Sequence, residues 1–210
     1  MINIFFQIAI LLFSVTIHES AHGAAAEKLG DPTARMAGRI SLNPLRHLDL
    51  FTSVMLPVLL ILFRSPIIFA MAKPVPINPY NFKDQKYGSA KSAVAGPLAN
   101  LGVALVFGLA LRLIPFSQVS QNLFWQNIFQ IFGFIVFINL ILAIFNLMPI
   151  PPLDGSHILF TFLPRSFNNL KIFLARYGFF ILILFLLFLL PIIFPVVQFL
   201  FKLITGIAFV

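Results

Sequence analysis

The sequence is 210 residues long, with 60% hydrophobic and 10% charged residues, a net charge of +8 and a mean hydropathy of +1.01. These values exclude a soluble globular domain and predict an all-α polytopic membrane protein. The chain has no cysteine, which excludes disulfides and thiolate metal sites. Any metal must therefore be held by His, Asp or Glu.

Six apolar runs follow one another along the chain, and most are close to the ~20 residues that a helix needs to cross the hydrocarbon core. They cover residues 3–27, 48–72, 92–114, 124–148, 173–190 and 192–209. No basic segment precedes the first run and no small-residue cleavage site follows it, so we expect a retained span rather than a signal peptide. The runs predict about five transmembrane helices plus a re-entrant or sixth hydrophobic segment at 48–72.

Three polar residues, His18, Glu19 and His22, lie deep in the first apolar run. Because His18 and His22 are four residues apart, they share one helix face and can bind one zinc ion. Glu19 lies beside that face and can act as the general base toward a zinc-bound water. The alternative is a solvated helix face, but burying these groups in a membrane helix costs several kcal/mol unless they are paired or bind a metal. We therefore predict one Zn²⁺ per chain.

Lysine and arginine concentrate in three stretches of the chain: 28–46, 73–91 and 165–176. The loop at 115–126 has none, so the positive-inside rule places the basic stretches in the cytoplasm and this loop outside. Both flanks of 48–72 are then on the same side, which predicts a re-entrant hairpin interrupted at Arg64 and Pro66. The alternative is an ordinary span in which Arg64 is paired.

A catalytic zinc site usually has three protein ligands and an open position, so a third ligand is expected. The chain has six acidic residues, and most of them lie in polar loops or at the ends of apolar runs. Asp154 differs because it follows the run 124–148 within a proline-rich turn. His157, three residues later, is the rival. A re-entrant 48–72 leaves two crossings between His22 and Asp154, which allows them to meet on one side of the membrane.

Two asparagines, Asn139 and Asn146, are seven residues apart and share one helix face, with Asn146 nearer the proline-rich turn. An asparagine there can hold a substrate backbone or a developing oxyanion. The alternative is hydrogen bonding between helices. For Gly96 and Pro97 we expect close helix packing rather than catalysis.

Several stretches together resemble the signature regions of the site-2 protease family of intramembrane zinc metalloproteases: HESAH, AGPLANL at 95–101 and FNLMPIPPLDGSHIL at 145–159. Two others, AGRISLNPLRHLDLF and KPVPINPYNF, are similar to its compact bacterial branch that lacks a PDZ domain. The resemblance implies a catalytic base at Glu19 and places two further polar residues, Asn100 and Asn146, near the site. The resemblance also implies that the zinc ligands are His18, His22 and Asp154.

We therefore predict a single integral-membrane metalloprotease domain over residues 1–210, in the cytoplasmic membrane, with its active site towards the cytoplasm. Its substrate is expected to be a transmembrane segment of another membrane protein, which unwinds in the lipid bilayer and pairs with an edge from 48–80. The alternative is a divalent-cation transporter or metal-binding membrane scaffold. No nucleic-acid partner is expected, because the basic residues follow one membrane side, and no particular oligomeric state is predicted.

Overall fold

The computed structural model describes residues 3–49, 72–115 and 121–207, together with Met55, Leu59, Leu62, Phe63 and Val119. Over these residues the chain is helical and contains no strand, which confirms the all-α prediction. The principal helices are α1 (Ile4–Lys28), α2 (Thr33–Met36), α4 (Gly88–Arg112), α6 (Leu123–Asn146), α7 (Asp154–Phe162) and α8 (Asn168–Thr205). Short 3₁₀ turns are η1 (Pro44–His47), η3 (Pro79–Asn81) and η4 (Arg165–Phe167).

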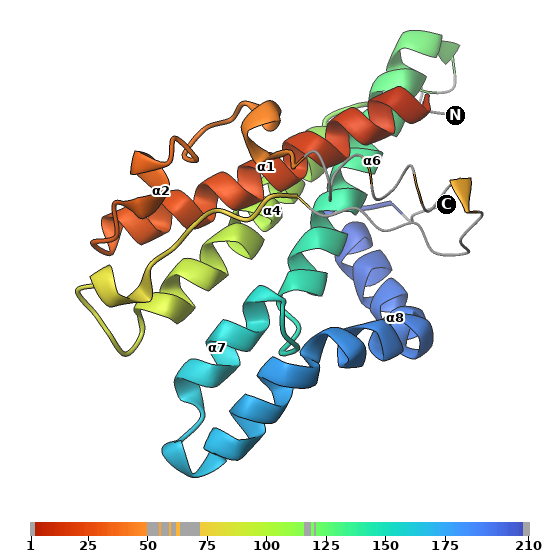
Figure 1. Cartoon of the computed structure of the whole chain (residues 1–210). Coiled ribbons are helices and arrows are strands. Elements are labelled where there is room, and N and C mark those ends of the chain that lie inside the picture. The colour runs from red at the N-terminus through yellow and green to blue at the C-terminus, as the bar shows by residue number, and fades with distance from the viewer. Residues whose placement is uncertain are drawn as a thin grey trace.

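Among the described residues, four helical segments are long and apolar enough to cross a membrane: α1, α4, α6 and Arg165–Leu186. Each overlaps a predicted apolar run, although the last begins at Arg165, within the predicted basic stretch 165–176, rather than at 173. The protein is a multi-pass membrane protein. The run 173–190 and the run 192–209 as far as Thr205 lie in a single helix, α8, which ends in the shorter apolar segment Ile193–Thr205. Figure 1 shows α8 bending along its length. The sequence of α8 contains Pro191 and Pro195, and an internal proline favours a bend because it removes a backbone hydrogen bond.

Helix α4 lies between the other long helices and packs against α1, α6, α7 and α8 (Figure 1). The buried apolar core forms where α4, α6 and α8 meet, and consists of Ala104, Leu111, Val136, Leu140, Val197 and Phe201. A Cβ on Gly108 would lie 2.3 Å from Cγ2 of Ile204, so this glycine allows α4 and α8 to approach closely. The core holds α4 in a fixed position against its neighbours.

Two segments that follow α1 in the sequence fold back and lie alongside it, as Figure 1 shows. One contains α2 and η1, and the other is the extended stretch 72–78 that leads to η3 and α4. The backbone N–H of Lys73 donates a hydrogen bond of 2.9 Å to the carbonyl of His47. The two flanks of 48–72 are therefore joined, as the hairpin prediction requires, while the predicted hairpin itself lies almost wholly outside the described residues.

Candidate metal centre

Three side chains from two distant parts of the sequence meet beside α1. The Nε2 atoms of His18 and His22 are 3.0 Å apart, and Oδ2 of Asp154 lies 3.1 Å from the first and 3.2 Å from the second. Both histidines are buried, at 5% and 6% exposure. Over the residues that the structure describes, this is the one group of His, Asp or Glu side chains able to hold a metal ion.

The hydrogen bonds behind the two imidazole rings determine which nitrogens face the cluster. Nδ1 of His22 lies 2.8 Å from the carbonyl oxygen of Ser92, which can only accept, so His22 carries its proton on Nδ1. Nδ1 of His18 lies 3.1 Å from the side-chain oxygen of Asn100, which also accepts. In the neutral rings both Nε2 atoms then present lone pairs, as does the Asp154 carboxylate. Three acceptors converge with no proton between them, an arrangement that a cation stabilises.

Gly96 on α4 leaves the space that such a cation needs. A Cβ at this position would lie 2.4 Å from Nε2 of His22 and 2.7 Å from Nε2 of His18. Zinc binds imidazole nitrogen at about 2.0–2.1 Å, so a methyl group there would compete with the ion for the same volume. The separations of 3.0–3.2 Å among the three ligand atoms are close to those in a tetrahedral site with bonds of that length. The residues present therefore fit zinc.

Asp154 reaches the histidines because the chain turns back sharply after α6. Pro149, Pro151 and Pro152 prevent α6 from continuing, and α7 starts at Asp154 itself. A Cβ on Gly155 would lie 2.2 Å from the carbonyl oxygen of Leu147, so glycine is needed for this close return. His157, the rival ligand, is exposed on α7 and is not part of the cluster.

Glu19 is half-buried and accepts a hydrogen bond of 3.0 Å at Oε2 from the backbone N–H of Val75. It follows His18 directly on α1, and it is absent from the three-residue cluster. The carboxylate thus has one oxygen fixed by the stretch 72–78. Its position beside the ligands suits a general base rather than a ligand.

The other predicted asparagines occupy different environments. Asn139 is fully buried and donates from Nδ2 to Oγ of Ser14 at 2.9 Å, which joins α6 to α1. Asn146 is half-buried and donates to the carbonyl of Leu142 in its own helix, which leaves it a second N–H. Asn139 therefore provides the interhelical hydrogen bond that sequence reasoning held as the alternative.

Two groups at the site were missed by sequence reasoning. The Ser92 carbonyl and the Val75 N–H belong to the backbone, and no side-chain pattern identifies such groups directly. The sequence nevertheless contains a pattern that points to the helix face on which Ser92 lies. Ser92, Gly96 and Asn100 are spaced by four residues, so they form one small and polar face of α4, and that face contacts the histidines.

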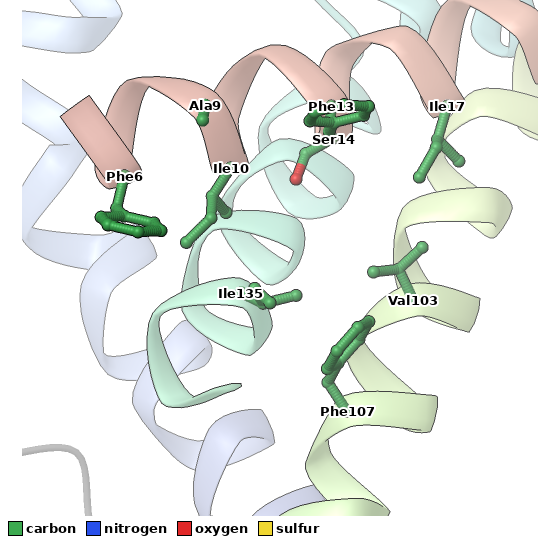
Figure 2. Close-up of a pocket in the computed structure, with 9 residues that line it drawn as sticks. All are labelled: Phe6, Ala9, Ile10, Phe13, Ser14, Ile17, Val103, Phe107 and Ile135. Atoms are coloured by element: carbon green, nitrogen blue, oxygen red, sulfur yellow. The ribbon is translucent and has the colours of Figure 1, made fainter. Parts of the chain in front are cut away.

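An apolar cavity of about 280 Å³ lies between α1, α4 and α6, separate from the cluster. Figure 2 shows Phe6, Ile10 and Ile17 of α1 facing Val103 and Phe107 of α4 and Ile135 of α6. Its one polar lining residue, Ser14, already bonds Asn139. With no titratable side chain in its lining, this cavity offers no group for acid–base catalysis.

Comparison with known proteins gives the family. The sequence model of Peptidase family M50 matches residues 112–189, a stretch that contains Asp154. The chain is 35% identical to "Putative zinc metalloprotease YwhC" of Bacillus subtilis over 170 residues, which cover 80% of this chain and 74% of that protein. It is 31% identical to "Putative zinc metalloprotease Rip2" of Mycolicibacterium smegmatis, over 69% of this chain and 52% of that protein. No solved structure gives a significant match.

The chain therefore belongs to peptidase family M50, the site-2 protease family, and is a membrane-embedded zinc metalloprotease. This confirms the resemblance found in the sequence, as well as the predicted enzyme class and the predicted Zn²⁺ cofactor.

Proposed function

We propose that this protease is an intramembrane endopeptidase of the cytoplasmic membrane that hydrolyses peptide bonds within or near transmembrane segments of membrane proteins. Residues 1–210 form its single catalytic domain. His18, His22 and Asp154 hold one Zn²⁺, and Glu19 is the general base. The active site faces the cytoplasm.

The observation that carries the proposal is the convergence of three ligand atoms, 3.0–3.2 Å apart, beside the apolar helix α1. His18 lies ten residues before the end of α1, or about 15 Å along the helix axis at 1.5 Å per residue. Polar groups at such depth are costly unless they are paired or bind a metal. A site below the membrane surface suits substrates whose scissile bonds also lie there.

The residues divide the chemistry among them. Zinc, when bound, polarises a peptide carbonyl and lowers the pKa of water. Glu19 takes the proton of the attacking water and returns it to the leaving amine. Among the residues that the structure describes, the Asn146 amide donates one hydrogen bond, so its second N–H can bind the substrate backbone or the developing oxyanion. Asn100 holds the ring of His18 from behind through Nδ1.

Charge supports the cytoplasmic orientation. The cationic residues that follow α1 in the chain, up to the first turn of α4, include Arg35, Arg39, Arg46, Lys73, Lys83, Lys86 and Lys91. At the opposite end of α4, Arg112 bonds the last carbonyls of α8 through Leu203 and Ile204. The end of α1 nearer the metal ligands thus carries the excess positive charge that is typical of cytoplasmic loops.

A transmembrane substrate must open its helix before its carbonyl can reach the site, because helical amides are occupied by intrahelical hydrogen bonds. Glycine or proline weakens a helix interior by about 1–3 kcal/mol. Such residues near the scissile bond are therefore expected to raise kcat/KM. The effect should be smaller for a soluble peptide that is already extended.

The test uses purified enzyme in bilayers with matched transmembrane substrates that carry Leu, Gly or Pro two to four residues from the cut. Wild type should cleave the Gly and Pro substrates faster, and Glu19→Gln should cleave none while it retains zinc. Cleavage by Glu19→Gln at the wild-type rate would reject the proposed base. Equal rates for the three substrates would reject helix opening as the limiting step.

A further inference from the structure

The extended stretch 73–78, called here the strap, is fixed to the protein at both ends. At its start, the N–H of Lys73 donates to the His47 carbonyl at 2.9 Å. At its end, the N–H of Asn78 donates to Oδ2 of Asp31 at 2.7 Å. Just beyond it, the N–H of Lys83 donates to the carbonyl of Leu29 at 2.9 Å. None of these three contacts involves a metal ligand, so they hold the strap independently of the metal centre.

Asp31 is the strongest of these anchors. Its carboxylate is fully buried and accepts hydrogen bonds from the N–H of Asn78, from Nδ2 of Asn81 at 2.8 Å and from the N–H of Thr33 at 3.1 Å. A buried carboxylate with several donors gives strong, charge-assisted bonds. The end of the strap is therefore tied to the loop that follows α1.

Between its anchors the strap presents one backbone donor to α1. Pro74 and Pro76 have no N–H, so Val75 carries the only one in that tripeptide, and it donates to Oε2 of Glu19 at 3.0 Å. The Val75 side chain is buried at 8% exposure. A Cβ on Gly23 would lie 3.2 Å from Cγ1 of Val75, so glycine at 23 permits the strap to lie this close to α1.

We propose that the strap is a fixed wall of the active site and that the Val75 amide is the positioning group for Glu19. It holds Oε2 and leaves Oε1 to accept the proton of the attacking water. A glutamate side chain has several rotatable bonds, and fixing one oxygen restricts the carboxylate to one orientation. The inference rests on the proposed function, because it assigns Glu19 as the base.

The test removes the donor without removing the residue's bulk. Val75→Pro lacks the N–H, and Pro76 already restricts position 75 to the extended β or polyproline II region, in which proline is also found. Val75→Ala keeps the N–H and shortens the side chain, so it is the matched control. We expect Val75→Pro to lower kcat about 10- to 100-fold, with KM and zinc content unchanged, as misplacement of a catalytic group does. Val75→Ala should stay within a few fold of wild type.

Two results would overturn the proposal. A rate for Val75→Pro equal to or above wild type would mean that the contact is dispensable or restrains the enzyme. An equal loss in Val75→Ala would assign the effect to packing of the side chain. Should Val75→Pro lose zinc or fail to fold, an ester in place of the 74–75 peptide bond removes the same N–H with the valine side chain intact, and the same kcat loss is expected.

The proposed function is judged separately in the same assay. Wild type and Glu19→Gln with equal rates would reject Glu19 as the base, whatever the Val75 variants do. A wild type that is active, a Glu19→Gln that is inactive and a Val75→Pro at the wild-type rate would leave the proposed function intact and reject only the positioning role.

Discussion

The side-chain oxygen of Asn100 lies 3.1 Å from Nδ1 of His18, on the side of the ring opposite Asp154. Asn100 is fully buried, and in the part of the chain that the structure describes its Nδ2 has no hydrogen-bond partner. Removal of a group that orients a metal-binding histidine typically weakens metal affinity 10- to 100-fold. We expect this loss for Asn100→Ala and for Asn100→Leu, measured by competition with a zinc chelator.

Asn139 is the matched control for this prediction. It is also fully buried, but it bonds Ser14 on α1 rather than a histidine. Asn139→Ala should lower stability by about 0.6 kcal/mol, as for an average interhelical hydrogen bond in a membrane, and leave zinc affinity unchanged. Equal zinc affinity in the Asn100 and Asn139 variants would show that Asn100 does not orient His18.

Gly96 is predicted to be essential for metal binding because of its missing side chain. In Gly96→Ala the added methyl group would lie 2.4 Å from Nε2 of His22, where the ion must fit. The variant should purify with little or no zinc. Gly102→Ala is the control, since a Cβ at 102 in the same helix meets no atom within 4 Å. Full zinc content in Gly96→Ala would contradict the assigned position of the ion.

The sequence predicts the parts of this site that depend on side-chain identity. His18, Glu19 and His22 can be found because one helical turn places them together, and Asp154 because acidic residues are rare in this chain. The Val75 N–H and the Ser92 carbonyl could not be found in this way, because every residue type other than proline offers the same backbone groups.

Helix α8 illustrates the same limit at the level of the fold. Pro191 divides the C-terminal apolar sequence into two runs, and proline is a common end of helices. In the structure the helix continues from Asn168 to Thr205 and bends. Whether a proline ends a helix or bends it depends on the tertiary packing around it, which a local pattern does not contain.

The hydrogen bonds of Asp31 should make the attachment of the strap sensitive to acid. Burial raises the pKa of Asp31, but hydrogen bonds from Thr33, Asn81 and Asn78 outweigh it and leave the pKa below its usual value. A depressed pKa in the folded state contributes stability above the unfolded pKa of about 3.9, and this contribution is lost as pH falls through the folded value. Asp31→Asn places an NH₂ group among these donors, so it should lower the free energy of unfolding at pH 7 by about 1–3 kcal/mol.

Thermal unfolding of wild type and Asp31→Asn from pH 7 to pH 3 measures this effect. The difference in Tm should be largest near neutral pH and should shrink below about pH 4. Asp84→Asn is the comparison, because Asp84 is more exposed and pairs with Lys91 at the surface. If the Tm difference between wild type and Asp31→Asn did not change with pH, the negative charge of Asp31 would make no contribution to stability.

Membrane orientation can be tested directly, because the chain has no cysteine of its own. Met36 and Tyr80 are 83% and 88% exposed, and Gln121 precedes α6. Single cysteines at 36 and 80 should react with an impermeant maleimide in inside-out vesicles, and one at 121 in intact cells. Labelling of position 36 or 80 in intact cells would reverse the proposed orientation.

Zinc stoichiometry in single-residue variants tests the proposed metal centre most directly. Wild type should contain one zinc per chain. His18→Ala, His22→Ala and Asp154→Ala should each contain much less, because each removes one of the three protein ligands, whose binding atoms lie 3.0–3.2 Å apart. His157→Ala should retain full zinc, since His157 is exposed and outside the cluster. If Asp154→Ala kept one zinc per chain while His157→Ala lost its zinc, Asp154 would not be the third ligand.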